Sequence, residues 1–149
     1  MVKIGDALPH FILPDENENP VNISDYIGEE PIIVFFYPKD DTPGCIVEAC
    51  SFRDNYDEFK LKGVMIFGIS SDDYRSHLNF KKKYSLPFPL LSDEDLAVHK
   101  MFGVTKTLGI FPGRKTYIAD WKGFVRNIFN SQLFPKRHVS EALNAINRL

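Results

Sequence analysis

The two cysteines of this sequence, Cys45 and Cys50, are the residues whose type and spacing most directly suggest chemistry. Both lie in the stretch PKDDTPGCIVEAC (38–50), just after a strongly apolar run. A thiolate is the reactive form of cysteine, and a helix start favours it through free N–H groups and the positive end of the helix dipole. A working redox pair is one interpretation of this stretch, and a buried pair without chemistry is the other.

The spacing of the two cysteines limits how they could bond. On an ideal helix, five residues separate the Cα atoms by roughly 8.7 Å, whereas a disulfide needs less than about 7 Å. An intact helix therefore excludes a static disulfide, and a transient one requires the first turns to unwind. The four intervening residues also disfavour a thioredoxin-type pair, which has two.

A zinc site is a weaker interpretation of the same cysteines. Zinc requires about four ligands from cysteine, histidine or acidic side chains. The histidines are distant from one another in sequence and show no paired ligand spacing: His10, His77, His99 and His138. We expect the last three to be surface or packing residues.

The elements around Cys45 follow from residue pattern. The run PIIVFFYP (31–38) is apolar, β-branched and aromatic, which is typical of a fully buried strand. Thr42 suits an N-cap and Pro43 a first helical position, and apolar residues then recur at helical spacing. The pattern predicts a helix over 42–63, ended by Gly63, with Cys45 near its start. Strand-to-helix turns of this kind lie at the sheet edge where ligands tend to bind.

The remaining pattern predicts an α/β fold with a mixed sheet. The polar stretch 14–20 indicates a turn between two short extended pieces. Further strands are expected over 64–70, 88–93, 114–120 and 123–130, and helices over 72–85, 94–103 and 136–149. Strands that alternate with helices give parallel βαβ units, and the late hairpin across the WKG turn (121–123) adds antiparallel strands.

Composition bounds the class of protein. A length of 149 residues suits one domain, expected over 1–149. The formal net charge of −2 gives no basic field for nucleic acid, and no run approaches the roughly 18 apolar residues of a membrane span. The N-terminal stretch lacks the pattern of a secretory leader, so we expect a cytoplasmic location. In a reducing cytosol, two cysteines are more often free, metal-bound or catalytic than a permanent disulfide.

The stretch around the two cysteines resembles the signature of a known protein family. PKDDTPGC (38–45) matches the Pro-x-x-x-Thr-x-x-Cys signature of the peroxiredoxins, and IVEAC places a second cysteine five residues later, which resembles the peroxiredoxin Q or bacterioferritin comigratory protein subfamily. The similarity continues in order through 68–93, 111–120 and the C-terminal KRHVSEALNAI. It implies a thioredoxin-like fold, with a central mixed β-sheet flanked by helices.

The resemblance assigns a role to each matching residue of the signature. Cys45 would be the peroxidatic cysteine, which attacks the peroxide. Thr42 would hydrogen-bond through its hydroxyl to the thiolate and to the peroxide. Pro38 would shield the pocket and shape its wall.

Three further residues complete the implied site. Arg114, from PGRKTY, would lie beside the thiolate, and Glu48 would hydrogen-bond that arginine. Cys50 would be the resolving cysteine. Each also has an ordinary structural interpretation, since an arginine is more often one end of a surface ion pair and a glutamate in the first turn suits the helix dipole.

The resemblance implies a thiol-dependent peroxidase that reduces hydrogen peroxide and organic hydroperoxides. Thioredoxin or a similar dithiol protein would reopen a Cys45–Cys50 disulfide, and no metal, haem or flavin would be needed because sulfur performs the redox chemistry. Subfamily resemblance favours a monomer. Two alternatives remain: a general disulfide oxidoreductase or redox-sensing module on the same fold, and an interaction protein with two inert cysteines.

Two features depart from the family pattern. Ile46 follows Cys45 where many relatives have threonine, and the loop 103–114 belongs to a region that varies among relatives. Neither feature removes a residue of the implied site.

Overall fold

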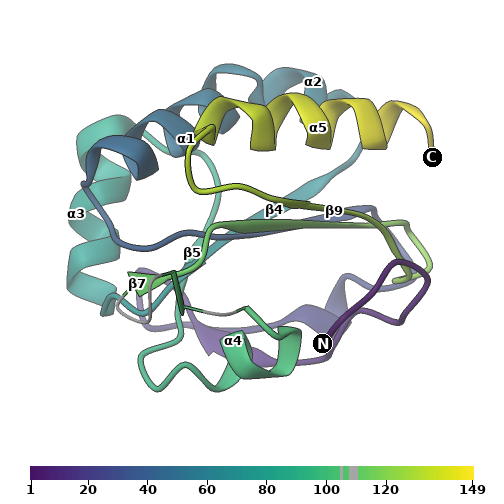
Figure 1. Cartoon of the computed structure of the whole chain (residues 1–149). Coiled ribbons are helices and arrows are strands. Elements are labelled where there is room, and N and C mark those ends of the chain that lie inside the picture. The colour runs from purple at the N-terminus through teal and green to yellow at the C-terminus, as the bar shows by residue number, and fades with distance from the viewer. Residues whose placement is uncertain (105, 108–110) are drawn as a thin grey trace.

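A computed structural model describes residues 1–104, 106–107 and 111–149, and its centre is a five-stranded sheet with the order β5-β4-β3-β8-β9 (Figure 1). The strands are β3 (Ile32–Phe36), β4 (Met65–Ser70), β5 (Leu90–Ser92), β8 (Lys115–Ala119) and β9 (Val125–Asn130). The first three are parallel to one another, and β8 and β9 are antiparallel to their neighbours. The predicted mixed sheet is confirmed.

Strand β3 lies at the middle of this sheet because both of its faces are apolar. Successive side chains of a strand point to opposite faces. Ile33 and Phe35 therefore pack into the core on one side, while Val34 and Phe36 pack into the core on the other. The continuous apolar run of the sequence is thus explained by burial on two faces.

Helices cover the two faces unequally (Figure 1). Helices α1 (Pro43–Asp54), α2 (Tyr56–Leu61) and α5 (Pro135–Asn147) lie over one face, and α3 (Tyr74–Tyr84) lies beside the β5 edge. Helix α4 (Ala97–Phe102) and the N-terminal part of the chain lie over the other face. That part contains the hairpin of β1 (Ile12–Pro14) and β2 (Pro20–Asn22) and the 3-10 helix η1 (Ile23–Asp25).

A separate two-stranded sheet is formed by β6 (Lys106–Thr107) and β7 (Phe111–Pro112). The loop 103–114, expected to vary within the family, lies partly outside the described residues. Within the part of the chain that the structure describes, no helix is both long and apolar enough to cross a bilayer.

The predicted helix over 42–63 is wrong in one respect, because the chain forms two helices there. Asn55 separates α1 from α2 with backbone angles of φ −104° and ψ 9°. Its side-chain amide donates to the carbonyl of Ser51 at 2.8 Å, an alternative to continued helix that asparagine offers readily. Gly63 does follow the second helix in the left-handed region, at φ +70°.

The close packing of side chains on neighbouring strands generates a first prediction at Gly68 in β4. A Cβ at this position would lie 2.8 Å from the Phe35 ring and 2.9 Å from Leu90, both fully buried. Gly68→Ala should therefore lower the free energy of unfolding by about 1–3 kcal/mol, the usual cost of overpacking a core. Urea unfolding measures this change.

The matched control for this prediction is Gly44→Ala, because a Cβ there meets only the tip of the Arg114 side chain. Because a side-chain tip can move more easily than a packed ring, Gly44→Ala should lose less stability than Gly68→Ala. Equal losses in the two variants would contradict the packing explanation for Gly68.

Candidate active site

Cys45 is the third residue of α1, after Thr42 at the N-cap, Pro43 and Gly44. The first backbone hydrogen bond of the helix runs from the Ile46 N–H to the Thr42 carbonyl. The N–H groups before Ile46 therefore have no intrahelical acceptor, and Pro43 has no N–H to satisfy. The Cys45 side chain is 1% exposed. The structure thus places a buried thiol at the positive end of a helix.

Arg114 brings a second positive group to this thiol. It immediately precedes β8, the strand that pairs with β3. Its Nη2 donates to the Cys45 Sγ at 3.3 Å, and its Nη1 donates to the Glu48 Oε1 at 2.5 Å. The guanidinium and the carboxyl group are both buried. A permanent cation is therefore held between a sulfur atom and a carboxyl group that lie close together on α1.

Gly44 allows this arrangement and was not predicted as a site residue. A Cβ on Gly44 would lie 2.9 Å from Arg114 Nη2, the nitrogen that contacts Cys45. Any larger residue would push the guanidinium away from the sulfur. The sequence did contain a signal for this role. Glycine is a poor helix former, so a glycine in the first turn of a helix suggests that a side chain would not fit there.

Thr42 lies at the predicted N-cap position, but the predicted side-chain cap is wrong. The Thr42 hydroxyl donates to the Lys39 carbonyl at 2.8 Å and makes no capping bond to the helix. Among the hydrogen bonds of the described residues, none joins this hydroxyl to Cys45. The hydrogen of the Thr42 hydroxyl is used in the bond to the Lys39 carbonyl. The expected bond from this hydroxyl to peroxide stays a prediction. Pro38 is half-buried in the segment that joins β3 to α1.

Cys50 lies on the same helix as Cys45, and both thiols are free. It is half-buried in a shallow groove of about 400 Å³, which is lined by Ile46, Val47, Cys50, Ser51, Asp54, Asn55 and Lys136. Burial raises the pKa of the Cys50 thiol, although the nearby Arg53 opposes this. At neutral pH Cys50 is therefore a thiol and not a thiolate in the folded protein. The intact α1 keeps the two sulfur atoms from bonding, as the spacing predicts.

Comparison with known proteins identifies this arrangement. A family model described as the AhpC/TSA family matches residues 4–128. Peroxiredoxin Q, chloroplastic, from Oryza sativa subsp. japonica is 48% identical over 149 residues, which is 99% of this chain and 68% of that protein. The chain belongs to the peroxiredoxin family. As a member of that family it is a thiol-dependent peroxidase, an oxidoreductase.

Solved structures agree with this assignment and confirm that the peroxiredoxin has a thioredoxin-like fold. Peroxidoxin BcpB from Mycobacterium tuberculosis superimposes with a TM-score of 0.92 at 34% identity, over 100% of this chain and 99% of that one. PrxQ from Xylella fastidiosa gives a TM-score of 0.91 at 28% identity, over 99% and 97%.

A second layer of contacts surrounds Glu48 in this peroxiredoxin. His138 on α5 has Nε2 at 2.7 Å from the Ser131 carbonyl, so Nε2 carries hydrogen and donates. Burial lowers the pKa of His138 to about 4, so the ring is neutral at pH 7 and Nδ1 carries no hydrogen. The Thr116 hydroxyl donates to this Nδ1 at 2.8 Å.

Glu48 lies between Arg114 and His138. The bare Nδ1 lies 3.4 Å from Glu48 Oε2, a buried oxygen with no hydrogen-bond partner among the described residues. Burial raises the pKa of Glu48 to about 8, against the attraction of Arg114. Glu48 is therefore mostly neutral at pH 7, and the Arg114 charge is left to the Cys45 sulfur.

Of the two roles expected for the histidines, surface or packing residues, the structure shows packing. His77, His99 and His138 are not surface residues, because each is at most 3% exposed and each lies within hydrogen-bond or ion-pair distance of a carboxyl group. Their partners come from other elements or from residues several positions away, so spacing gave no signal of the contacts.

The close approach of Gly44 to Arg114 generates the second prediction. Gly44→Ala should slow the reaction of Cys45 with hydrogen peroxide by about tenfold, because small displacements of a positioned donor are costly to catalysis. Stopped-flow measurement of the bimolecular oxidation rate tests this. A normal rate in a well-folded variant would contradict the role given to Gly44.

The protonation of Glu48 generates the third prediction. Glu48→Gln, which mimics the neutral acid, should keep the oxidation rate of Cys45 within about threefold at pH 7. As the pH rises through about 8, parent Glu48 ionises and competes for Arg114. The ratio of the parent rate to the Glu48→Gln rate should then fall, whereas a flat or rising ratio would exclude a neutral Glu48.

Stability gives an independent readout of the same protonation. A carboxyl whose pKa is raised on folding stabilises the protein when protonated, and this stabilisation is lost as the pH rises from about 4.5 to about 8. The free energy of unfolding of the parent, measured relative to Glu48→Gln, should therefore fall across this range and level off above it.

Proposed function

We propose that this chain works by an atypical two-cysteine peroxidase cycle, with Cys45 as the peroxidatic and Cys50 as the resolving cysteine. The observation that supports this most strongly is the contact of Arg114 with the buried Cys45 sulfur at 3.3 Å, at the start of the helix that also carries Cys50. A permanent cation and a helix start both stabilise a thiolate at this position.

The first step of the cycle oxidises Cys45. The thiolate sulfur donates an electron pair to one peroxide oxygen, the O–O bond breaks, and the other oxygen leaves as hydroxide or alkoxide, which takes up a proton. Cys45 becomes a sulfenic acid. Negative charge grows on the departing oxygen, and a fixed donor directed at that charge is the main catalytic lever. Arg114 supplies such donors, and Thr42 would position the peroxide.

The second step joins the two cysteines. The sulfur of Cys50 attacks the sulfenic sulfur of Cys45, a disulfide forms and water leaves. The first turns of α1 must unwind, since an intact helix separates the Cα atoms by roughly 8.7 Å. Unwinding also exposes the Cys50 thiol to water. Its pKa then falls, because burial is the main cause that raises it in the folded helix.

The third step restores the two thiols. A dithiol protein of the thioredoxin type would attack the disulfide, become oxidised itself and release reduced enzyme. Substrates would include hydrogen peroxide and organic hydroperoxides. A related structure, 29% identical, is described in connection with the alkyl peroxide reduction activity of the Xanthomonas campestris bacterioferritin comigratory protein. A cytoplasmic location and a monomeric state stay predictions.

General disulfide exchange with proteins fits the site less well. A protein thiol must approach a disulfide or thiolate along the sulfur–sulfur axis, and Cys45 is 1% exposed in a folded helix. A small peroxide can reach such a site without the access that a protein partner needs. Burial therefore favours peroxidase chemistry over a general oxidoreductase.

The cycle generates the fourth prediction. After one equivalent of hydrogen peroxide, the reduced parent should lose the mass of two hydrogens, with Cys45 linked to Cys50 in the same chain. Cys45→Ser should abolish turnover. Cys50→Ser should still react once but gain oxygen at Cys45 without a bridge. Intact mass and peptide mapping distinguish these products, and turnover in Cys45→Ser would disprove the mechanism.

A further inference from the structure

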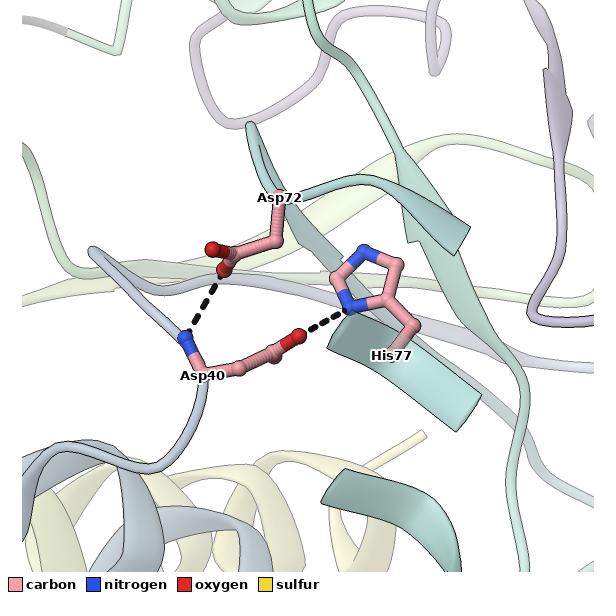
Figure 2. A group of neighbouring side chains, drawn as sticks. All are labelled: Asp40, Asp72 and His77. Carbon is pink, nitrogen blue, oxygen red and sulfur yellow. Dashed lines mark hydrogen bonds and ion pairs between the residues drawn. The ribbon is translucent and has the colours of Figure 1, made fainter. Parts of the chain in front are cut away.

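The segment that leads into α1, residues 38–42, is tied to α3 by a buried polar cluster. Asp40, Asp72 and His77 form the centre of this cluster (Figure 2). Asp40 comes from the leading segment, Asp72 from the turn after β4, and His77 from α3. His77 and Asp40 are almost completely buried. Nothing in the proposed cycle uses these three side chains.

The carboxyl group of Asp40 takes part in three hydrogen bonds. Its Oδ1 accepts from the Tyr37 hydroxyl at 2.6 Å. Its Oδ2 accepts from the Ser76 hydroxyl at 2.8 Å and lies 2.7 Å from His77 Nδ1. Burial and Asp40 together raise the pKa of Tyr37, so its hydroxyl keeps its hydrogen. Both oxygens of Asp40 are therefore engaged.

His77 is held from both sides of its ring. Its Nε2 lies 3.0 Å from the Leu91 carbonyl, which can only accept, so Nε2 carries hydrogen. A bare Nδ1 facing a carboxylate oxygen at 2.7 Å would be repelled, so one proton must lie between Nδ1 and Asp40. The pair is thus joined by a short hydrogen bond whichever group carries that proton.

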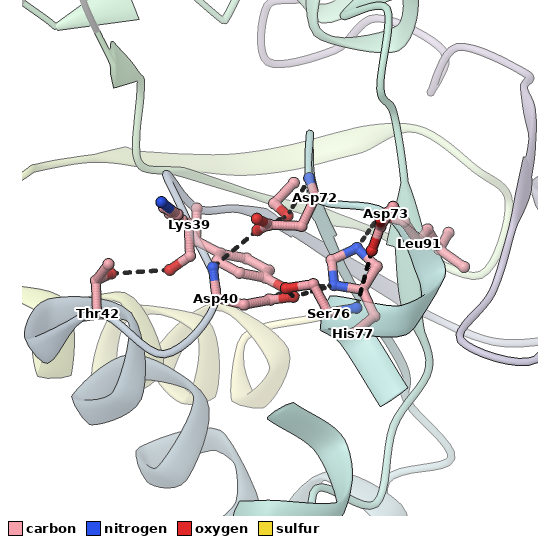
Figure 3. Close-up of polar contacts among 10 residues, drawn as sticks. Lys39, Asp40, Thr42, Asp72, Asp73, Ser76, His77 and Leu91 are labelled. Carbon is pink, nitrogen blue, oxygen red and sulfur yellow. Dashed lines mark hydrogen bonds and ion pairs between the residues drawn. The ribbon is translucent and has the colours of Figure 1, made fainter. Parts of the chain in front are cut away.

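The backbone of the leading segment is tied to the same place (Figure 3). The Asp40 N–H donates to Asp72 Oδ2 at 2.8 Å, and the Ser70 hydroxyl donates to that oxygen at 2.7 Å. At the end of the segment, the Thr42 hydroxyl donates to the Lys39 carbonyl. These contacts connect the end of β4 to the residue that begins α1.

A further anchor lies one residue along. Asp41 has a left-handed backbone, at φ +58°, which is unfavourable for a residue with a side chain. Its carboxylate accepts from Lys83 Nζ at 2.9 Å and from the Tyr84 hydroxyl at 3.0 Å, both on α3. Contacts to a separate helix therefore compensate an unfavourable turn just before the peroxidatic helix.

The three central side chains also have the ligand types of a metal site, with ligand atoms within 4.8 Å of one another. Asp40 and His77 use both their ligand atoms in the hydrogen bonds above, and Asp72 Oδ2 accepts two more. A metal would have to break these bonds. The cluster is accounted for by hydrogen bonding within the protein.

We propose that Asp40 and His77 are positioning residues that hold the leading segment on α3 and thereby keep the first turns of α1 folded around Cys45. This inference rests on the proposed cycle, in which those turns must unwind. The anchored segment ends at Thr42, and unwinding starts with the residues that follow it. The Asp40–His77 pair therefore sets how much of the enzyme has an unwound helix start.

This balance decides between two fates of the Cys45 sulfenic acid. In the unwound form, Cys50 condenses with it and releases water. In the folded form, a second peroxide molecule oxidises the sulfenic acid to sulfinic acid, and water is again released. Weakening the anchor should therefore favour the disulfide over the sulfinic acid and should slow the first oxidation.

The test measures the partition of Cys45 in one turnover. Reduced protein is mixed with excess hydrogen peroxide and no reductant, and intact mass gives the disulfide (loss of two hydrogens) and the sulfinic acid (gain of two oxygens). His77→Leu should raise the ratio of disulfide to sulfinic acid by about fivefold or more, because it removes the bonds to both Asp40 and the Leu91 carbonyl. Ser76→Ala, which removes only one bond to Asp40, should raise it by about twofold to threefold and keeps the test usable if His77→Leu does not fold.

Two further variants separate positioning from general stability. His77→Asn places an amide nitrogen near the position of Nδ1 and should restore the partition toward that of the parent. His99→Leu is the matched control, because His99 is equally buried and its Nδ1 lies 2.6 Å from Asp93, with its ring against Phe36 on the opposite face of the sheet. It should lower stability without changing the partition.

The outcomes are distinct. If the parent forms no Cys45–Cys50 disulfide, the proposed cycle fails. If the parent forms it but Ser76→Ala and His77→Leu partition as the parent does, or shift toward sulfinic acid, the anchor is disproved and the cycle remains. If His99→Leu shifts the partition equally, the effect is one of general stability and the anchor is again disproved.

Discussion

The structure around Cys45 depends on one contact, that of a single arginine with both a sulfur and a carboxyl group. A buried guanidinium is costly unless its charge and hydrogens are matched. Here Cys45 and Glu48 accept from its two terminal nitrogens, and Gly44 leaves the space for one of them. Burial raises the pKa of Glu48 against the attraction of Arg114, so the Cys45 sulfur is the second acceptor that this buried cation has. The placement of one buried cation therefore fixes both the sulfur and the carboxyl group around it.

The fold supplies this contact by placing distant segments side by side. Arg114 precedes β8, and Cys45 follows β3, and these two strands pair in the centre of the sheet. The apolar residues of β3 hold that centre from both faces, while α5 brings His138 over Glu48. Each group that surrounds the sulfur is thus mounted on a packed element, which limits its freedom to move away.

Much of this arrangement was predictable from the sequence. The rest could not be predicted, and there is a physical reason for each miss. The strand at 31–38, the helix start at Thr42 and the closeness of Arg114 and Glu48 to Cys45 came from pattern and from family resemblance. The break at Asn55 was missed because a side-chain bond to Ser51 overrides helical periodicity locally. The contacts of His77 and His138 were missed because they join residues far apart in sequence. Burial of a histidine with its partner is decided by tertiary packing, which spacing along a single helix does not encode.

The break at Asn55 has a consequence for how far a change in α1 can spread. Helix formation is cooperative along one uninterrupted segment. Helix α2 begins after the break, and its Phe59 side chain is buried in the core. Loss of the α1 hydrogen bonds therefore need not extend into α2. The chain around the cysteines is thus divided into two cooperative units. In the proposed cycle only the first would unwind and re-form in each turnover, and the second would preserve the core against which it refolds.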